Sequence, residues 1–385
     1  GDDNTSYYLG TSTTQQEGVL VGQNYNRKSV RFNANQQATD WLEVFAKFNY
    51  ALEEVKRVNN DNNIFGVLST GLLEAPGIPV YDDQGEFTTS GFLFSNPVQM
   101  AYEVDGVSDN SRIVGNVGLT ARILEGLSFK TILNMDRIDF RERRYMPATT
   151  SWGNTYNGKG FLTTDNYTKW LTTNQLNYNT NLGDLNVDAT GVVEYQDYNR
   201  TFNHAETSNF PTPDLRWPFS GSELANDYGN PGYQTENKLF SIVGRVGLSY
   251  DDRYFLEGAF RSDASSRFGS DKRTGYFPSG ALGWKLHNEA FLDVDAISEL
   301  KLNASYGITG NESGIGDFTS LTVATSKAYG DFSGIHVDQL GDSKLSWEET
   351  SQLNAGVTLG LFNDRILLEY QYYNKKTTNL LLNKP

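Results

Sequence analysis

The chain has 385 residues, no cysteine and a formal net charge of −15. The absence of cysteine excludes disulfide bonds and thiolate metal sites. The acidic balance excludes a nucleic-acid-binding surface, which would need a basic patch.

Hydropathy gives no sign of a membrane-spanning helix, since no run approaches 18 consecutive apolar residues. Aromatic residues nevertheless make up 13% of this polar chain. Strands that cross a bilayer hide half of their residues from a hydropathy average, and barrels carry aromatic girdles at both interfaces. The composition is therefore compatible with a membrane β-barrel.

The chain contains thirteen long segments whose residues suit β-strands. In chain order they are residues 5–16, 28–37, 41–54, 111–123, 127–139, 168–182, 185–199, 238–250, 253–263, 275–287, 298–309, 346–361 and 365–376. In the segment 298–309, apolar residues stand at 300, 302, 304, 306 and 308, and polar or small residues stand between them. Such alternation gives a strand one apolar face and one polar face. Strands of about 9 to 11 residues with this pattern are typical of transmembrane barrels.

The connections between these segments alternate between short and long. Short, Gly- and Asp-rich links lie near residues 38–40, 124–126, 183–184, 251–252 and 362–364, with a somewhat longer one at 288–297. Long links cover about 55–110, 140–167, 200–237, 264–274 and 310–345, with a shorter one near 17–27. We expect a short helix near Ile64–Leu73 in the first of the long links. Sorting of this kind predicts an all-β, antiparallel, up-and-down transmembrane barrel.

A series of short motifs marks the last third of the chain. The motifs are Asp251-Asp252-Arg253-Tyr254, Arg261 to Gly269, Tyr276-Phe277-Pro278-Ser279 with Gly283-Trp284, Ala304 to Asn311, Leu345 to Thr350, Leu361 to Arg365, and Tyr372 to Thr377. In this order they resemble the SusC/RagA family of TonB-linked outer-membrane transporters. Residues 7–41 fit the early barrel of that family more loosely. Ala264 departs from the pattern, because a glycine is expected there.

The resemblance implies a bacterial outer-membrane barrel filled by an N-terminal plug that the TonB complex opens from the periplasm. It also implies a SusD-like surface lipoprotein as partner and an oligosaccharide, or sometimes a peptide, as cargo. No segment here resembles a plug or a TonB box. We therefore expect residues 1–385 to be a partial barrel domain, about thirteen strands of a roughly 22-stranded barrel without its plug.

The sequence offers no catalytic or cofactor-binding signature, so we expect no enzyme activity, no cofactor and no metal site. The three histidines, His204, His287 and His336, lack metal-ligand spacing. Charged and amide side chains on the polar strand faces should instead line the lumen and meet the plug or water. These lumen-facing candidates are Arg245, Glu257, Arg261, Lys301, Asn303, Glu369 and Gln371.

Aromatic side chains in the long links are candidates for sugar contacts, because flat rings match the apolar faces of sugars. These candidates are Trp152, Tyr156, Tyr167, Trp217, Tyr228, Tyr233 and Tyr329. Trp217 is the first choice, since it lies in a stiff segment between Pro213 and Pro218. Each of these rings could alternatively pack loops together or touch the lid protein.

The predicted function is active, TonB-dependent import of oligosaccharides or other large nutrients through the outer membrane. Two alternatives remain open on the sequence alone. One is a passive porin-type diffusion barrel, which would have neither plug nor TonB box. The other is a soluble β-rich adhesin or binding module.

Overall fold

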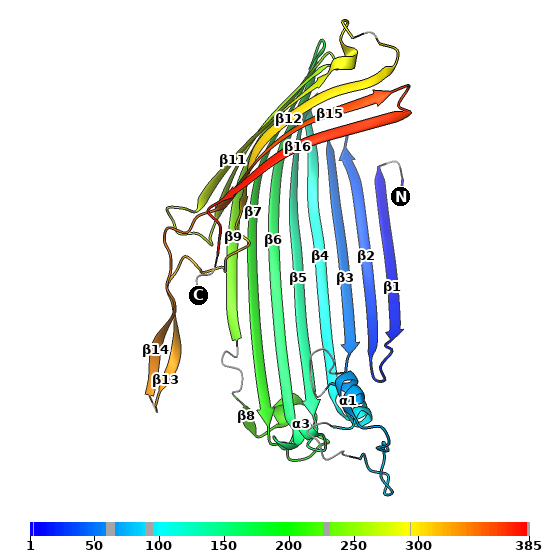
Figure 1. Ribbon diagram of the computed structural model, residues 1–385, viewed down its shortest axis with the longest axis vertical. Coiled ribbons are helices and arrows are strands. Elements are labelled where there is room, and N and C mark those ends of the chain that lie inside the picture. The colour runs from blue at the N-terminus through cyan, green and yellow to red at the C-terminus, as the bar shows by residue number, and fades with distance from the viewer. Residues whose placement is uncertain are drawn as a thin grey trace.

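The computed structural model describes residues 1–2, 4–58, 66–88, 95–225, 232–292, 294–330 and 332–382. Most of them belong to one antiparallel sheet, which Figure 1 shows as a tall, curved wall. Its main path contains thirteen strands: β1 (Thr5–Glu17), β2 (Asn24–Thr39), β3 (Leu42–Lys56), β4 (Asp105–Leu124), β5 (Leu127–Met146), β6 (Lys159–Leu182), β7 (Leu185–Ser208), β9 (Gly232–Tyr250), β10 (Tyr254–Ser265), β11 (Thr274–Lys285), β12 (Ile297–Asn311), β15 (Glu348–Leu361) and β16 (Ile366–Thr378). Each strand pairs with its neighbour in the chain path, so the up-and-down order is confirmed.

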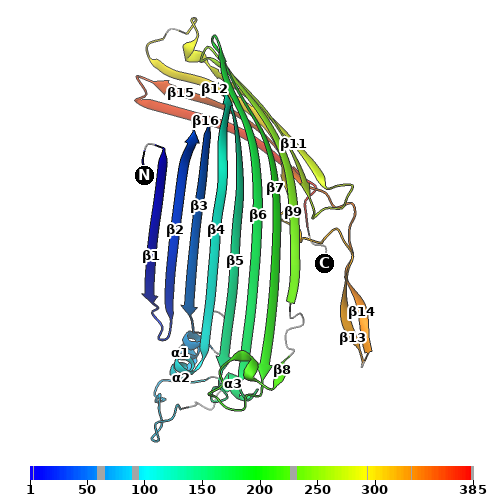
Figure 2. The ribbon, with the colours of Figure 1, turned by 180° about the vertical axis from the view of Figure 1, so that it is seen from behind.

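Three strands lie outside the predicted set. The short strand β8 (Glu223–Ala225) pairs with the end of β7. Strands β13 (Val323–Tyr329) and β14 (Phe332–Gln339) form a separate hairpin, which hangs beside the sheet in Figures 1 and 2. Their sequence mixes small, charged and apolar residues without clear alternation, which is why the sequence analysis placed them in a long link.

The helices are short and gather in the connections. They are α1 (Val67–Leu73), α2 (Pro97–Glu103), α3 (Ser151–Asn154) and the 3₁₀ turns η1 (Pro218–Ser220) and η2 (Leu286–Asn288). Helix α1 occupies the described part of the predicted helix, since residues 64 and 65 lie outside the described residues. The Asn96 side chain caps α2 by accepting hydrogen bonds from the backbone of Val98 and Gln99. Among the described residues, no helix is long and apolar enough to span a membrane.

The loops are sorted between the two rims of the wall. The short turns follow β2, β4, β6, β9, β11 and β15, at the upper rim in Figure 1, and α1, α3 and β8 lie at the lower rim. The tightest turns use left-handed backbone conformations at Gly126, Gly183, Asp251 and Asp252. Two long links are shorter than predicted, because β5, β6, β7 and β9 all extend further toward the lower rim.

The apolar strand faces point away from the interior of the wall. Four side chains from the apolar faces of β12, β15 and β16 are exposed on this chain: Leu302 by 36%, Tyr306 by 51%, Val357 by 38% and Leu368 by 54%. On β12 the apolar residues from 302 to 306 are more exposed than the polar residues between them. Side chains converge on the concave face of a curved sheet, so the polar series lies on the concave, inward face. The apolar series forms the convex, outward face, as predicted.

The outward apolar band has a defined limit toward the rim that carries the long links. On β9 the outward series from Phe240 to Tyr250 is apolar or glycine, and the next outward residue is Lys238. These ten residue steps span about 33 Å along a strand. A strand tilt of about 40° converts that length into a band about 25 Å tall, the height expected for a membrane barrel.

From β9 to β3, the limit of the band moves closer to the rim that carries the long links. Strand pairing through β7, β6, β5 and β4 connects Phe240 with Ala46 on β3. The last outward apolar residue of β3 is Leu52, followed by Glu54, so the limit has moved by six residues. That shift is about 20 Å along the strand, over five strand spacings that total about 24 Å. The implied strand tilt is about 40°, within the range of transmembrane barrels.

Aromatic rings mark the rim that carries the short turns. Tyr254 stacks between Tyr250 and Trp284, with ring centroids 6.4 and 6.2 Å apart. The Tyr254 hydroxyl and the Trp284 indole N–H both donate hydrogen bonds to Glu289, over 2.6 and 2.8 Å. These bonds lower the pKa of the Glu289 carboxyl, with the Tyr254 bond contributing most. An apolar ring with a polar tip is the side chain that a membrane interface favours.

Candidate functional site: an aromatic and charged stripe on the inward face

Strand β7 continues well beyond the apolar band. Its outward apolar series ends at Tyr195, and the strand runs on to Ser208. Those thirteen steps correspond to about 43 Å along the strand, or roughly 30 Å of height at the same tilt. The wall between β5 and β9 therefore extends far beyond the apolar band toward the rim that carries the long links, and its inward face is available to line a chamber there.

The inward face of this extension carries a continuous stripe of functional side chains. Because alternate residues share a face, the inward series of β7 runs opposite to Leu185 and Tyr195. This series contains aromatic, cationic and acidic side chains in turn: Tyr198, Arg200, Phe202, His204 and Glu206. Strand pairing places Tyr167 and Asp165 of β6 and Tyr233 of β9 beside it.

Arg200 organises the half of the stripe that lies nearer the apolar band. Its guanidinium donates two hydrogen bonds to the carboxylate of Asp165, over 2.8 and 2.6 Å. The Tyr233 ring lies 5.6 Å from the same guanidinium and stacks on Phe202, with centroids 5.1 Å apart. The hydrogen bonds to Asp165 raise the pKa of Arg200, so the cation is permanent. The result is a rigid, half-exposed platform of ring faces around a fixed cation.

Two further tyrosines extend this platform toward the apolar band. Tyr167 and Tyr198 lie with ring centroids 6.0 Å apart. Burial raises the pKa of both hydroxyls, so both remain neutral hydrogen-bonding groups at physiological pH. A set of flat rings with neutral hydroxyls and one paired cation can bind polyhydroxylated ligands by stacking and hydrogen bonding.

A buried ion pair lies in the other half of the stripe, near the rim that carries the long links. The Lys159 ammonium lies 3.0 Å from a Glu206 carboxylate oxygen, and the two side chains are only 6% and 3% exposed. Lys159 also lies over the rings of Tyr156 and Phe161, at 4.3 and 5.0 Å. His204 bridges Glu206, at 3.3 Å, and a Thr163 hydroxyl, at 2.8 Å. These contacts anchor the chain where β6 begins and β7 ends.

Helix α2 packs on the inward side of the wall at this rim, near the ion pair. Met100 of α2 and Val104, which caps its C-terminus, pack with Met146 of β5 in a fully buried cluster, against which Trp152 and Phe161 also pack. The candidates Trp152 and Tyr156 thus lie inside the mouth, where both take part in packing. Their role in substrate contact stays a prediction.

Trp217 lies on the opposite side of the wall. The preceding Arg216 pairs with Asp105 over 3.0 Å, and Phe210 packs on Tyr145 with centroids 4.8 Å apart. Strand pairing places Asp105 and Tyr145 on the outward face, in the same series as the apolar residues of β4 and β5. The segment from Phe210 to Trp217 therefore covers the outer surface near the lower rim, away from the inward stripe.

The remaining aromatic candidates are scattered. Tyr233 and Tyr167 lie within β9 and β6 rather than in loops, because these strands extend further than predicted. Tyr329 is almost fully exposed on the separate hairpin. Tyr228 lies outside the described residues.

The lumen-facing candidates lie together on the inward face of the membrane band. Arg245 bonds to Asp188 over 2.8 Å and to Glu257 over 2.7 Å. Arg261 bonds to Asp263 and Ser241. Lys301 and Asn303 line the recess that also contains Arg245 and Glu257. Strand pairing puts Glu369 in the row of Lys301, through Thr358, and Gln371 two residues further along β16.

Sequence reasoning missed the core of the stripe, Arg200, Phe202 and Asp165. The signal was available, since the alternation of β7 continues through 198, 200, 202, 204 and 206. Both faces are polar beyond Tyr195, however, so the contrast that marks a membrane strand fades there. Within the described ranges, no group of three or more His, Asp or Glu side chains could hold a metal ion.

Comparison with known proteins adds the family context. No family model matches the chain. It is 28% identical to the TonB-dependent receptor P3 of Formosa agariphila, over 100% of this chain and 40% of the relative. It is 29% identical to the TonB-dependent receptor SusC of Bacteroides thetaiotaomicron, over 99% of this chain and 40% of the relative. The chain thus spans about two fifths of the length of these curated relatives.

Solved structures show the same fold. The RagAB peptide transporter matches with a TM-score of 0.82 and 24% identity, over 98% of this chain and 43% of that one. The ferric citrate transporter FecA matches with a TM-score of 0.53 and 8% identity, over 98% of this chain and 47% of that one. In fold, sorted loops and apolar band, the chain matches the wall of the outer-membrane β-barrels of TonB-dependent receptors. Within that class, the resemblance to the SusC/RagA type is confirmed.

Proposed function

We propose that this chain forms part of the barrel wall of a TonB-dependent outer-membrane importer. Residues 1–385 would be a partial barrel domain of that importer, which takes up oligosaccharides or other large nutrients together with a SusD-like surface lipoprotein. The observation that carries the proposal is the inward stripe around Arg200, which presents ring faces and fixed polar groups above the membrane band. The relatives named SusC and the RagAB peptide transporter support both the import and the pairing with a second component.

The stripe favours oligosaccharide over peptide as cargo. Stacked rings offer apolar faces of the size of a sugar ring, and paired ions beside them offer hydrogen bonds to hydroxyl groups. In the half of the stripe nearer the apolar band, Arg200 is paired with Asp165, so no net charge selects an ionic ligand there. We infer that the proton gradient drives import through TonB and the plug.

Uptake assays with the full-length receptor test this proposal. We expect Tyr233→Ala to reduce uptake of labelled neutral oligosaccharides about tenfold, because one base- or sugar-sized stacking contact is worth about 1–3 kcal/mol. Tyr276→Ala is the matched control, since Tyr276 stacks on Phe260 in the same way on the outward face. A protonophore should abolish uptake in the wild type.

Three results would count against the proposal. Uptake that persists with the protonophore would indicate a passive diffusion barrel. Equal losses in the Tyr233 and Tyr276 variants would remove the special role of the inward stripe. Uptake of labelled peptides but not of oligosaccharides would replace the cargo class.

A further inference from the structure

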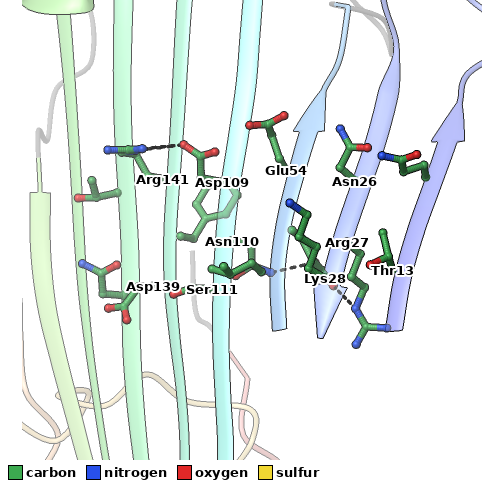
Figure 3. Close-up of a pocket in the computed structure, with 16 residues that line it drawn as sticks. Thr13, Asn26, Arg27, Lys28, Glu54, Asp109, Asn110, Ser111, Asp139 and Arg141 are labelled. Atoms are coloured by element: carbon green, nitrogen blue, oxygen red, sulfur yellow. Dashed lines mark hydrogen bonds and ion pairs between the residues drawn. The ribbon is translucent and has the colours of Figure 1, made fainter. Parts of the chain in front are cut away.

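The outward face of the wall carries a polar groove next to the apolar band. The groove has a volume of about 690 Å³ and extends over β1 to β6. Strand pairing shows that most of its lining belongs to the outward series. Figure 3 shows these side chains, among them Lys28, Glu54, Asp109, Asp139 and Arg141.

The position of the groove fixes its depth in the membrane. On β2, β3 and β4 the paired outward residues Val30, Tyr50 and Ile113 form an apolar row, and the member of this row on β5 is Arg137. The next row contains Lys28 and Leu52, and the row after that is wholly polar. The groove therefore begins where the hydrocarbon ends, on the rim that carries the long loops. Its direct neighbour in an outer membrane is the headgroup layer of the outer leaflet.

One guanidinium group of the lining, that of Arg141, is held ready for an anion, and that of Arg137 lies at the edge of the groove, where its partner Asp139 belongs to the lining. Arg141 donates through Nε and Nη2 to Asp109, over 3.3 and 2.7 Å. Arg137 donates in the same way to Asp139, over 2.9 Å each. Both side chains are about half exposed. Since a guanidinium has five N–H donors, each keeps donors on its other nitrogen for a phosphate oxygen.

Lys28 adds a third cation between these groups and strand β1. Among the described residues no ion pair occupies its ammonium group, and its side chain is exposed. Amide, hydroxyl and carboxylate groups fill the rest of the lining, including Asn26, Glu54, Ser111 and Thr164. Such groups exchange hydrogen bonds with sugar hydroxyls. The lining holds the cations Lys28 and Arg141 beside the outward carboxylates Glu54, Asp109 and Asp139, so cations for a phosphate and acceptors for sugar hydroxyls lie side by side.

We propose that this outer-wall groove binds the phosphorylated sugar headgroup of an outer-leaflet glycolipid. Cations recognise the phosphate, amides and carboxylates recognise the sugar hydroxyls, and Leu52 and Tyr50 contact the first part of the acyl chains. An ordinary phospholipid would use the cations but leave the sugar-binding groups without a partner. The inference rests on the outer-membrane location and is independent of the imported cargo.

Binding of purified lipid A, a phosphorylated glucosamine-disaccharide lipid, tests the proposal. The full-length receptor in detergent micelles would be titrated with lipid A, and bound lipid counted by native mass spectrometry. We expect Arg141→Gln and Lys28→Gln each to weaken binding about fivefold, the effect of one cation near a membrane surface. Among the described residues the Lys28 ammonium forms no ion pair, so its replacement should leave the fold intact.

Arg112→Gln provides the matched control. Arg112 lies on the inward face of the neighbouring strand, bonds in the same way to Asp136, and is 47% exposed where Arg141 is 50% exposed. We expect this variant to bind lipid A like the wild type. Unchanged binding in both Arg141→Gln and Lys28→Gln, or an equal loss in Arg112→Gln, would overturn the proposal. Competition by phosphatidylglycerol as strong as by lipid A itself would show a phospholipid site instead.

Discussion

Single residues at the mouth of the wall show how burial decides the worth of an ion pair. Lys159 and Glu206 are almost inaccessible to water, whereas Arg137 and Asp139 are 51% and 38% exposed. Exposed pairs contribute about 0–1 kcal/mol, because water screens the charges. Breaking a buried pair leaves an uncompensated charge in a dry site, which costs about 3–5 kcal/mol.

Glu206→Gln should therefore loosen the rim between β5 and β6. We expect amide hydrogen exchange of residues 147–158 to accelerate by at least a hundredfold in the full-length protein, since the lost 3–5 kcal/mol sets the opening equilibrium. The exposed-pair variant Asp139→Asn should change this exchange less than fivefold. The double variant Lys159→Met with Glu206→Leu should restore slow exchange. Unaltered exchange in Glu206→Gln would contradict the assigned role of the pair.

At the scale of strands, the depth of each outward residue determines the cost of placing a charge there. Val246 lies in the middle of the outward series of β9, and Gln234 lies on the same strand and face beyond the band. An arginine at the bilayer midplane costs about 2–4 kcal/mol, whereas near the interface it costs about 0–1 kcal/mol. We expect Val246→Arg to lower the unfolding free energy by about 3 kcal/mol and Gln234→Arg to leave it unchanged.

Reversible unfolding of the full-length barrel in lipid vesicles by denaturant measures this difference. Val243→Arg, on the inward face of the same strand, separates lipid exposure from a general effect of arginine. Equal effects at 246 and 234 would show that the outward face of β9 does not meet lipid.

The same contrast between faces explains which elements the sequence could predict. All thirteen long strands were recognisable, because lipid on one side and a polar lumen on the other impose strict alternation from Leu185 to Tyr195 and in similar stretches. The ends of β5 and β7 were placed too early and the beginning of β6 too late, because water lies on both sides of the wall beyond the band. The hairpin β13–β14 was missed because its sequence mixes small, charged and apolar residues without clear alternation.

Functional residues were harder to predict than strands. The inward position of Arg245 and Glu257 follows from alternation alone. Trp217, by contrast, was chosen for its stiff proline-flanked segment, which carries no information about the side of the wall it covers. The stripe around Arg200 depends on three strands coming together, and one strand read by itself does not reveal the partners Asp165 and Tyr233.

At the scale of the whole molecule, three features agree on one orientation in the membrane. The loops sort by length onto two rims, the outward faces form a band about 25 Å tall, and the limit of that band climbs at about 40°. The inward stripe lies between the apolar band and the long-loop rim, where a nutrient would arrive. The outward groove lies at the headgroup level of the same rim.

A single-cysteine scan along β9 tests this orientation most directly, and the chain offers a background without native cysteine. Each residue from 238 to 250 would carry a spin label in the full-length receptor reconstituted in lipid vesicles. Our account predicts that labels at 240, 242, 244, 246, 248 and 250 collide with lipid-soluble oxygen, while labels at the odd positions collide with a water-soluble nickel complex or are shielded. Equal access of the nickel complex to both series would contradict a lipid-facing outward surface.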